Sequence, residues 1–484
     1  SLRSNLTPRV DRVIQKALNK DPRRRYEKMG DFISDLQSIT SETDSGEVTV
    51  QRPAEAKRSS VAVLPFVDMS PQKDQEYFCD GIAEELLSAL SQIRELHVAS
   101  RTSAFQFKGT AMDVRDIGEQ LNVGTVLEGS VRKAGDRVRV TARLVNVSDG
   151  YRIWTEQYDR DMKDIFAIQD EIAQNIAQAL EVALGPDEKS PIEKTKPKDV
   201  EAYDYYLQGR QLFHQLRRKP LELARQMFSR SIEIDPNYGR AYAGLADCSS
   251  YLRLYFGAGE EAVEEAKRAS ARALELDPDL AEARVSRGFA LSLTKAYDEA
   301  ENELKKAIEL NPSLFEAHYI AARVYFAQGR YDDAAKHFER STEISPEAYD
   351  PWYFLAVCYR TMGRTDEVRT ATLETVEAAK KRLATHPDET RAWTFGAAAL
   401  ADLGEPDKSA EWIGRALAID PDEPVIQYNA ACTYAGLGKV DEALRCLRTA
   451  TGMGFVSREW IENDSDLDPI RDDPRFGELL SELS

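Results

Sequence analysis

The chain has 484 residues, of which 42% are hydrophobic and 30% are charged, a balance typical of a globular protein of about three domains. Asp and Glu number 83 against 64 Lys and Arg, so the formal net charge is −19. Nucleic acids and membrane surfaces are anionic and would repel such a chain. We therefore expect no general nucleic-acid or membrane-surface binding.

The sequence contains no run of about 18 apolar residues, which is the length that a membrane span needs. Its first residues lack the apolar core of a signal peptide, so we expect a cytoplasmic protein. The five cysteines form no CxxC pair, and the five histidines show no metal-ligand spacing. We therefore expect no disulfide framework, no metal and no cofactor.

Residues 1–40 are predicted to form two short amphipathic helices, which are too small to build a core alone. The motif Lys20-Asp21-Pro22-Arg23-Arg24-Arg25-Tyr26 resembles the last helices of a bacterial Ser/Thr protein kinase domain. The resemblance implies a kinase C-lobe remnant and an upstream kinase domain in cis; the alternative is an unrelated helical hairpin. No glycine-rich loop, VAIK lysine, HRD or DFG motif occurs, so we expect no kinase activity from this chain. The polar stretch 41–58 is predicted to be a linker.

Residues 59–185 are predicted to form a small α/β domain. An apolar strand at 60–66 precedes an amphipathic helix that opens at Asp80, and a second helix is expected near 113–121. The alternating residues 125–133 and 138–147 predict an antiparallel hairpin, because the turn at 134–136 contains a glycine. A third strand at 151–158 and a helix at 162–184 are expected to follow.

These segments resemble the TolB-like domain that precedes repeat arrays in many bacterial signalling proteins. We find no catalytic constellation in the region, because it has no phosphate-binding loop, Cys/His pair or paired carboxylates. Its hairpin carries a run of basic side chains, which could bind an anion. Alternating charge on a solvated strand face is the favoured interpretation. The basic residues are Arg132, Lys133, Arg137, Arg139 and Arg143.

From residue 199 to 457, helix-like runs end repeatedly in a proline. The prolines are Pro236, Pro278, Pro312, Pro346, Pro387 and Pro421, with gaps of 42, 34, 34, 41 and 34 residues. These gaps indicate a unit of 34 residues with insertions in two copies. Each unit has the composition of two packed helices. A glycine is expected to take the left-handed conformation at the turn between them, as at Gly329, Gly363, Gly404 and Gly438.

The period and the small/large pattern resemble the tetratricopeptide repeat (TPR). About seven units are expected, and the resemblance implies a right-handed α-solenoid with a concave groove. The first helix of a unit begins with an aromatic residue at Tyr242, Trp352 and Trp393. Other units carry Arg284, His318 and Gln427 at this position.

The resemblance also implies that the first helix of each unit lines the groove, where a protein or peptide partner would bind. For each residue, packing against the next unit is an equal alternative. The fixed Lys/Asn/Asn/Lys/Arg set that clamps a C-terminal carboxylate in some members is absent, so chaperone-tail binding is not expected. The candidate groove residues are Phe289, Tyr319, Arg323, Phe326, Tyr353, Phe354, Arg391, Phe395, Tyr428 and Asn429.

Residues 458–484 are predicted to cap the solenoid. An acidic run there admits a metal-binding loop as the alternative, although it lacks the glycine and the distal glutamate of a calcium loop. The acidic residues are Glu462, Asp464, Asp466, Asp468, Asp472 and Asp473.

The sequence therefore predicts a multidomain, mainly α protein: a TPR solenoid preceded by a small α/β domain and a short helical remnant. The favoured function is non-catalytic partner binding and sensing in a bacterial Ser/Thr kinase signalling protein. The alternatives are the regulatory part of a transcriptional regulator or nucleotide cyclase, or an enzyme whose reactive cluster escaped notice.

Overall fold

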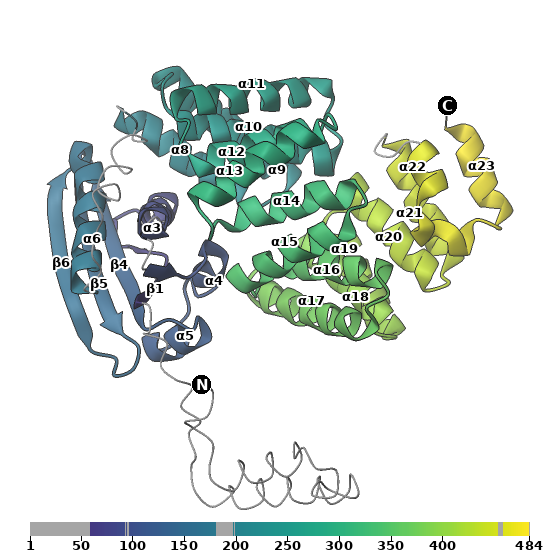
Figure 1. The fold of residues 1–484 in the computed structure, drawn as a ribbon, viewed down its shortest axis with the longest axis horizontal. Helices are drawn as coiled ribbons and strands as arrows, with labels where there is room; N and C mark the ends of the chain where they lie inside the picture. Colours follow the sequence, from purple (N-terminus) through teal and green to yellow (C-terminus); the bar gives the residue numbers. More distant parts are fainter. Residues whose placement is uncertain are drawn as a thin grey trace, which may run out of the picture. The chain divides into compact units, whose positions relative to one another are not determined.

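The computed structural model describes residues 59–91, 93, 96–180, 197, 199–453 and 458–483 (Figure 1). These residues belong to one compact unit that begins at Ser59. The helices predicted in residues 1–40 and the linker at 41–58 lie outside the described residues. Among the helices that are described, none combines the length and the apolarity that a bilayer crossing requires.

A mixed sheet forms the first part of this unit, with strand order β3-β1-β4-β5-β6. Strand β1 runs parallel to β3 and β4, whereas β4, β5 and β6 form an antiparallel meander. The predicted hairpin is confirmed, because β4 and β5 pair from Thr125↔Asn146 to Ala134↔Arg137. The strands are β1 (Ser59–Val63), β2 (Val67–Asp68, paired with β4), β3 (Leu96–Val98), β4 (Thr125–Ala134), β5 (Arg137–Asn146) and β6 (Arg152–Asp161).

Helices α3 (Glu76–Ser91) and α6 (Ile165–Ala179) pack on one face of the sheet in the main core. A smaller cluster around Ala62 and Val126 lies under α5 (Val114–Gln120) on the other face, and α4 (Arg101–Phe105) follows β3. The predicted helix at 162–184 begins as the 3-10 turn η2 (Met162–Asp164), and α6 itself ends at Ala179.

The basic residues of the hairpin mostly face solvent and form ion pairs across the strands. Arg137 and Arg139 each approach Asp159 of β6 to 2.5 Å, and Arg143 lies 3.6 Å from Glu128. Lys133 pairs with Asp204 of the first repeat at 2.9 Å. The structure therefore favours the solvated strand face over an anion site.

The repeat region contains seven helix pairs within the described residues, each joined by a short turn. The pairs are α8 (Val200–Phe213) with α9 (Arg218–Ile234), α10 (Gly239–Phe256) with α11 (Glu260–Leu276), α12 (Ala281–Ser292) with α13 (Tyr297–Leu310), α14 (Phe315–Ala327) with α15 (Tyr331–Ile344), α16 (Tyr349–Thr361) with α17 (Thr365–Thr385), α18 (Thr390–Asp402) with α19 (Pro406–Ile419), and α20 (Pro424–Gly436) with α21 (Val440–Gly452).

The two long proline gaps correspond to longer helices. Helix α17 has 21 residues, and α10 and α11 have 18 and 17, whereas the helices of the 34-residue units have 12 to 14. The left-handed turn is also confirmed, since Gly329, Gly363, Gly404 and Gly438 have φ between 70° and 76°. Lys295 takes the same role in an earlier unit at φ 60°.

The first position of the sequence pattern serves as a hydrogen-bond donor in five units. Trp352 and Trp393 each donate their indole N–H to the carbonyl of the proline six residues earlier, at 2.9 Å. Gln427 donates to Pro421 at 2.7 Å and Arg284 to Pro278 at 2.7 Å. The Nε2 of His318 lies 3.1 Å from the Pro312 oxygen. Burial lowers the pKa of His318 to about 4, so the ring is neutral and its Nε2–H donates. In these five units the shared property is a side-chain N–H donor, and the side chain need not be aromatic.

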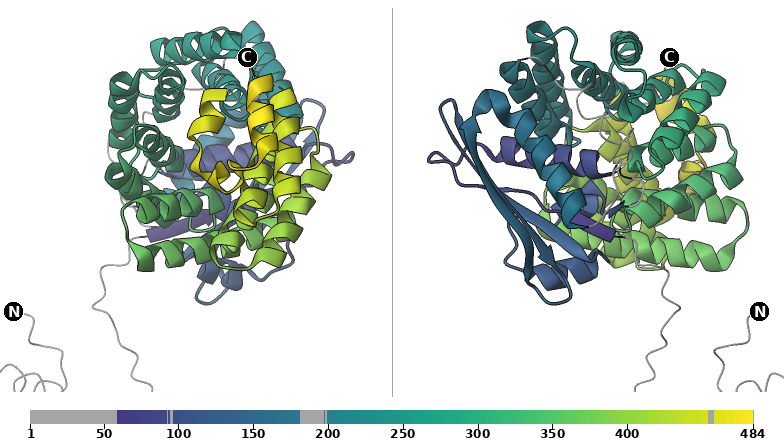
Figure 2. Two further views of the ribbon diagram at one scale, coloured as in Figure 1. Left: turned by 90° about the vertical axis from the view of Figure 1, so that its right-hand side faces the viewer. Right: turned by 60° about the vertical axis from the view of Figure 1, so that its left-hand side comes forward.

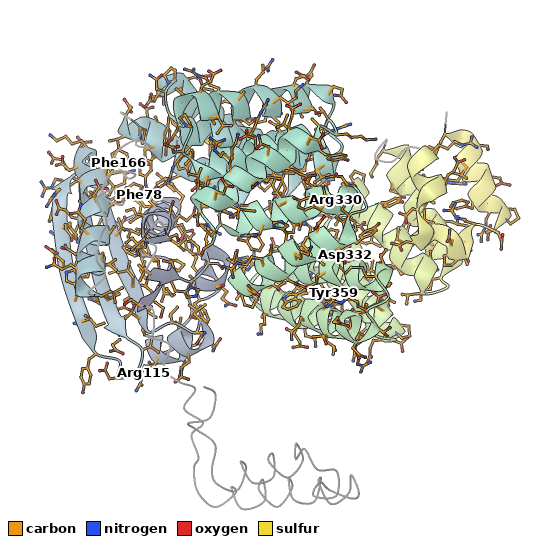
Figure 3. All side chains as sticks on the ribbon, viewed as in Figure 1. Phe78, Arg115, Phe166, Arg330, Asp332 and Tyr359 are labelled. Carbon is orange, nitrogen blue, oxygen red and sulfur yellow. The ribbon has the colours of Figure 1, made fainter. Side chains whose placement is uncertain are left out.

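The α/β part and the first repeats share a single core. Phe78 and Phe166 lie between the sheet and the repeats, where the Phe166 ring meets Tyr203 at 4.8 Å (Figure 3). Helix α8 approaches α3 so closely that a Cβ on Gly81 would lie 2.4 Å from Leu207. This packing joins the sheet to the solenoid through direct contacts between α3 and α8.

A buried ion cluster lies beside this junction. Glu84 of α3 binds Arg101 at 2.6 Å and Arg210 of α8 at 3.2 Å. Burial alone would raise the pKa of Glu84, but Arg101 and Arg210 hold it well below its usual value. The carboxylate therefore stays ionised and ties α3 to the first repeat.

Candidate functional site: a cavity inside the superhelix

The repeats curve round until the start of α9 in the first pair meets the loops before and after the sixth pair (Figure 2). At the start of α9, Arg217 lies 3.2 Å from Asp388 and 3.3 Å from Asp420, and Arg218 lies 3.1 Å from Glu423. These ion pairs join segments that are 171 to 205 residues apart in the sequence. They close one side of a cavity of about 810 Å³ inside the superhelix.

Helix α18 supplies a continuous wall of this cavity. Its lining residues Arg391, Thr394, Phe395, Ala398 and Asp402 recur at the three- and four-residue spacing of one helix face. The opposite walls come from α14, α16, α20 and the end of α10. The first helices of five of the seven described units thus line the cavity.

The structure places seven of the ten candidate groove residues around the cavity. These are Arg323, Tyr353, Phe354, Arg391, Phe395, Tyr428 and Asn429. The other three pack between helices, as the alternative interpretation held. Phe289 is 5% exposed and meets Tyr251 at 5.3 Å, Tyr319 is 4% exposed and meets Phe338 at 6.1 Å, and Phe326 lies between Tyr331 and Phe354 at 5.5 Å from each.

Two arginines gather around Tyr255 at one end of the cavity. Arg323 donates a 2.6 Å hydrogen bond to the Tyr255 hydroxyl and stacks on Phe354 at 4.3 Å. Arg391 lies 4.6 Å from the Tyr255 ring centre and 3.5 Å from Asp350. Burial alone would raise the pKa of Tyr255, but the two guanidinium groups hold it below its ordinary value. This end therefore has a positive potential. Tyr255, near the end of α10, is not among the candidate groove residues predicted from the sequence.

Carboxylates gather at the other end. The tail segment η4 (Ser465–Ile470), which follows α22 (Arg458–Asn463) and precedes α23 (Pro474–Glu482), packs against α20 and brings Asp464 and Asp466 to the cavity. The Tyr428 hydroxyl donates a 2.5 Å hydrogen bond to Asp464. Burial and the neighbouring Asp464 and Asp402 raise the pKa of Asp466.

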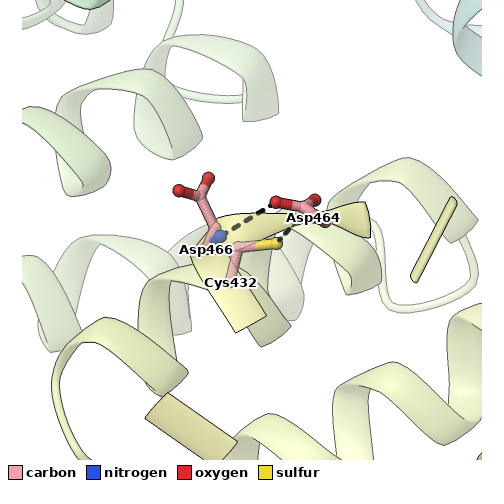
Figure 4. A group of neighbouring side chains, drawn as sticks. All are labelled: Cys432, Asp464 and Asp466. Atoms are coloured by element: carbon pink, nitrogen blue, oxygen red, sulfur yellow. Dashed lines mark hydrogen bonds between the residues drawn. The ribbon is translucent and has the colours of Figure 1, made fainter. Parts of the chain in front are cut away.

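Cys432 completes a set of possible metal ligands with these two aspartates (Figure 4). One ligand atom from each residue lies within 4.8 Å of the others, and the Cys432 thiol is 3.9 Å from Asp464. Burial and the two carboxylates raise the pKa of Cys432 well above its usual value, so the group is a protonated thiol at neutral pH. The set could hold a divalent cation only after losing that proton.

Aromatic rings connect the two ends. Tyr353 meets Phe395 at 4.8 Å, and Phe354 meets Phe395 at 5.8 Å. The cavity is thus aromatic in its middle, positive at one end and negative at the other.

Comparison with known families identifies tetratricopeptide repeats in this chain. Residues 290–349, 325–384 and 425–453 each match a tetratricopeptide repeat family. Residues 56–175 match the second domain of HilA/YgeH-like transcriptional regulators. The chain therefore carries a TPR array.

One curated relative is the protein named "Putative adenylate cyclase 3" of Rhizobium meliloti (strain 1021), which is 36% identical over 237 residues. That alignment covers 49% of this chain and 40% of the relative's length. Among solved structures, a thermophilic TPR protein of Thermus thermophilus is 21% identical, with 40% of this chain and 98% of that chain covered and a TM-score of 0.33. The protein pilF of Pseudomonas aeruginosa is 20% identical, with 47% and 96% covered and a TM-score of 0.33.

Proposed function

We propose that the described residues form a non-catalytic interaction and sensing module of a bacterial cytoplasmic signalling protein, which binds a peptide segment of a partner in the superhelical cavity. The observation that supports peptide binding most strongly is the cavity. Its volume of about 810 Å³ is within the range of ligand sites, and its middle offers aromatic rings.

The shared core gives this module a route for signalling. Leu207 of the first repeat fills the space beside Gly81 of α3, and Glu84 is bound to Arg210. The α/β part also touches a later repeat, where Ser103 donates a 2.7 Å hydrogen bond to Glu347. A change in the curvature of the superhelix on ligand binding would therefore strain contacts to the α/β part.

Two kinds of parent protein are candidates for this module. A Ser/Thr kinase parent rests on the motif Lys20–Tyr26, and the TolB-like assignment rests on the resemblance of residues 59–185. The match to the Rhizobium meliloti protein and the match to a transcriptional regulator domain support the second candidate, a regulatory part of a nucleotide cyclase or transcription factor. Sequencing the codons upstream of Ser1 discriminates these parents: HRD and DFG motifs support the kinase, and a cyclase or winged-helix domain supports the second candidate.

Peptide binding is tested by filling the cavity. Ala398 lines the cavity on α18, so Ala398→Trp places a large ring inside it. Ala327 lies at the end of α14 and outside the cavity lining, and Ala327→Trp is the matched control. A randomised pool of heptapeptides, acetylated and amidated, is equilibrated with the 484-residue protein, and the retained peptides are quantified by mass spectrometry. We expect the wild type and Ala327→Trp to retain peptides and Ala398→Trp to lose them. Equal retention by all three proteins contradicts the proposal.

A further inference from the structure

We propose that the cavity selects a peptide segment with an acidic and a basic side chain three to five residues apart, the acid at Arg323 and Arg391 and the base at Asp464 and Asp466. The inference rests on the proposed function and adds the chemical class of the ligand. It follows from the charges left uncompensated inside the cavity and from the distance between them.

The positive end has more cationic than anionic charge. Arg323 is hydrogen-bonded to the hydroxyls of Tyr255 and Tyr319, and within the described chain it makes no ion pair with a carboxylate. Arg391 forms an ion pair with Asp350, but the nitrogen–oxygen distance of 3.5 Å is long for such a pair. A ligand carboxylate here would complete the guanidinium hydrogen bonding in a setting that is largely shielded from water.

The negative end has more anionic than cationic charge. Arg360 is paired with Asp402, whereas neither Asp464 nor Asp466 has an ion-pair partner among the parts of 59–483 that the structure describes. The ring of Tyr353 lines the same part of the cavity. A lysine or arginine side chain of a ligand would find two carboxylates and an aromatic face there.

Helix α18 gives the distance between the two ends. Arg391 and Asp402 are eleven residues apart on it, and both line the cavity. At 1.5 Å per residue they are about 16 Å apart along the helix axis. An extended peptide spans at most about 3.3 to 3.6 Å per residue, so roughly five residues cover this distance. Because the ligand's own side chains reach toward each end, three to five residues suffice.

The two carboxylates of the acidic end also belong to the set of possible metal ligands. Asp464 already accepts hydrogen bonds from the Tyr428 hydroxyl and the Asp466 backbone N–H. An ammonium or guanidinium group of a ligand can donate to both carboxylates beside these donors. A metal ion at this set is therefore one outcome that the experiment must separate.

The test is the composition of the peptides retained from the capped heptapeptide pool, in which every charge comes from a side chain. We expect retained peptides to be enriched about tenfold over the input in pairs of Lys or Arg with Asp or Glu at a spacing of three to five. Asp464→Asn/Asp466→Asn should remove the enrichment in basic residues and keep that in acidic ones. Arg323→Gln/Arg391→Gln should do the reverse.

Two control variants and one condition separate the alternatives. Asp472→Asn, on the same tail but outside the cavity, and Arg369→Gln, at an exposed position of α17, should leave both enrichments unchanged. Circular dichroism checks the helical fold of each variant. Arg391→Lys keeps a positive charge, so it should retain part of the acidic enrichment that Arg323→Gln/Arg391→Gln loses. Retention without charge selection overturns this inference and leaves the proposed function standing. A basic enrichment that appears only when EDTA is added also overturns it, by assigning the acidic end to a metal. No retention above that of Ala398→Trp contradicts both.

Discussion

Gln427 donates a hydrogen bond from Nε2 to the carbonyl oxygen of Pro421 at 2.7 Å, where the equivalent Trp393 donates its indole N–H to Pro387 at 2.9 Å. The shared requirement is an N–H that reaches back six residues. The carbonyl of an inter-repeat proline ends a helix and lacks an intrahelical partner, so a side-chain donor satisfies it.

This requirement predicts that Gln427→Leu destabilises the protein although leucine is apolar and similar in size. Gln427 is 9% exposed, and losing the donor leaves the Pro421 oxygen without this partner, which costs about 1–2 kcal/mol. Gln427→His, which copies His318 of another unit, should lose less. Urea unfolding followed by circular dichroism measures the difference. Equal stability of Gln427→Leu and wild type would show that the position does not need a donor.

A second prediction concerns the close approach of α3 and α8. A methyl group at Gly81 would lie 2.4 Å from Leu207, which is 2% exposed and has little space to move. Gly81→Ala should therefore cost about 1–3 kcal/mol through overpacking, against a helix-propensity gain of at most about 1 kcal/mol.

Gly414→Ala is the matched control for this prediction. Gly414 lies inside α19, and nothing lies within 4 Å of a Cβ placed on it, so the substitution should stabilise the protein by up to about 1 kcal/mol. Thermal unfolding compares the two variants. A midpoint for Gly81→Ala at or above the wild-type value would show that α3 and α8 are not held this closely.

A third prediction is a pH dependence that comes from Asp247 of α10. Burial raises its pKa to about 7, and Glu316 adds to this, while Ser286 and Arg210 act against it. Between its unfolded pKa of 3.8 and about 7, the folded protein holds a proton that the unfolded chain has lost. The contribution of Asp247 to stability therefore falls as pH rises, by at most about 1.4 kcal/mol per pH unit, and is constant above about pH 7.

Asp247→Asn should remove this dependence. The variant minus wild-type difference in unfolding free energy should rise in favour of asparagine from about pH 5 to about pH 7 and then level off. Urea unfolding at intervals of about one pH unit across and above this range provides the curve. A difference that is constant throughout would mean that Asp247 titrates near its ordinary pKa in the folded protein.

The solenoid was predictable from sequence because its signals are local. A proline such as Pro312 ends a helix wherever it occurs, and Gly329 permits a left-handed turn without tertiary support. Spacing alone located the insertions in two units. It did not show that the extra residues extend helices, as in the 21-residue α17, because helix length depends on packing against the neighbouring unit.

The cavity was only partly predictable, for the opposite reason. Arg217 and Asp420 are 203 residues apart, and their contact depends on the accumulated curvature of the intervening units, which no short motif encodes. Phe289 and Tyr353 look alike as aromatic residues on first helices, yet one is buried between helices and the other lines the cavity. The sequence predicts that the acidic tail caps the solenoid. Its pairing of Asp464 with Tyr428 is a tertiary contact.

The central claim is that a partner segment binds inside the superhelix, and photocrosslinking tests it most directly. The heptapeptide pool is synthesised with one benzophenone side chain and irradiated with the 484-residue protein, and the attachment sites are located by mass spectrometry. We predict attachment on the inward faces of α16, α18 and α20, at residues such as Tyr353, Phe395 and Asn429, and its loss in Ala398→Trp. Attachment confined to the outer helices α11, α13 and α15 or to strand β6 would contradict the account.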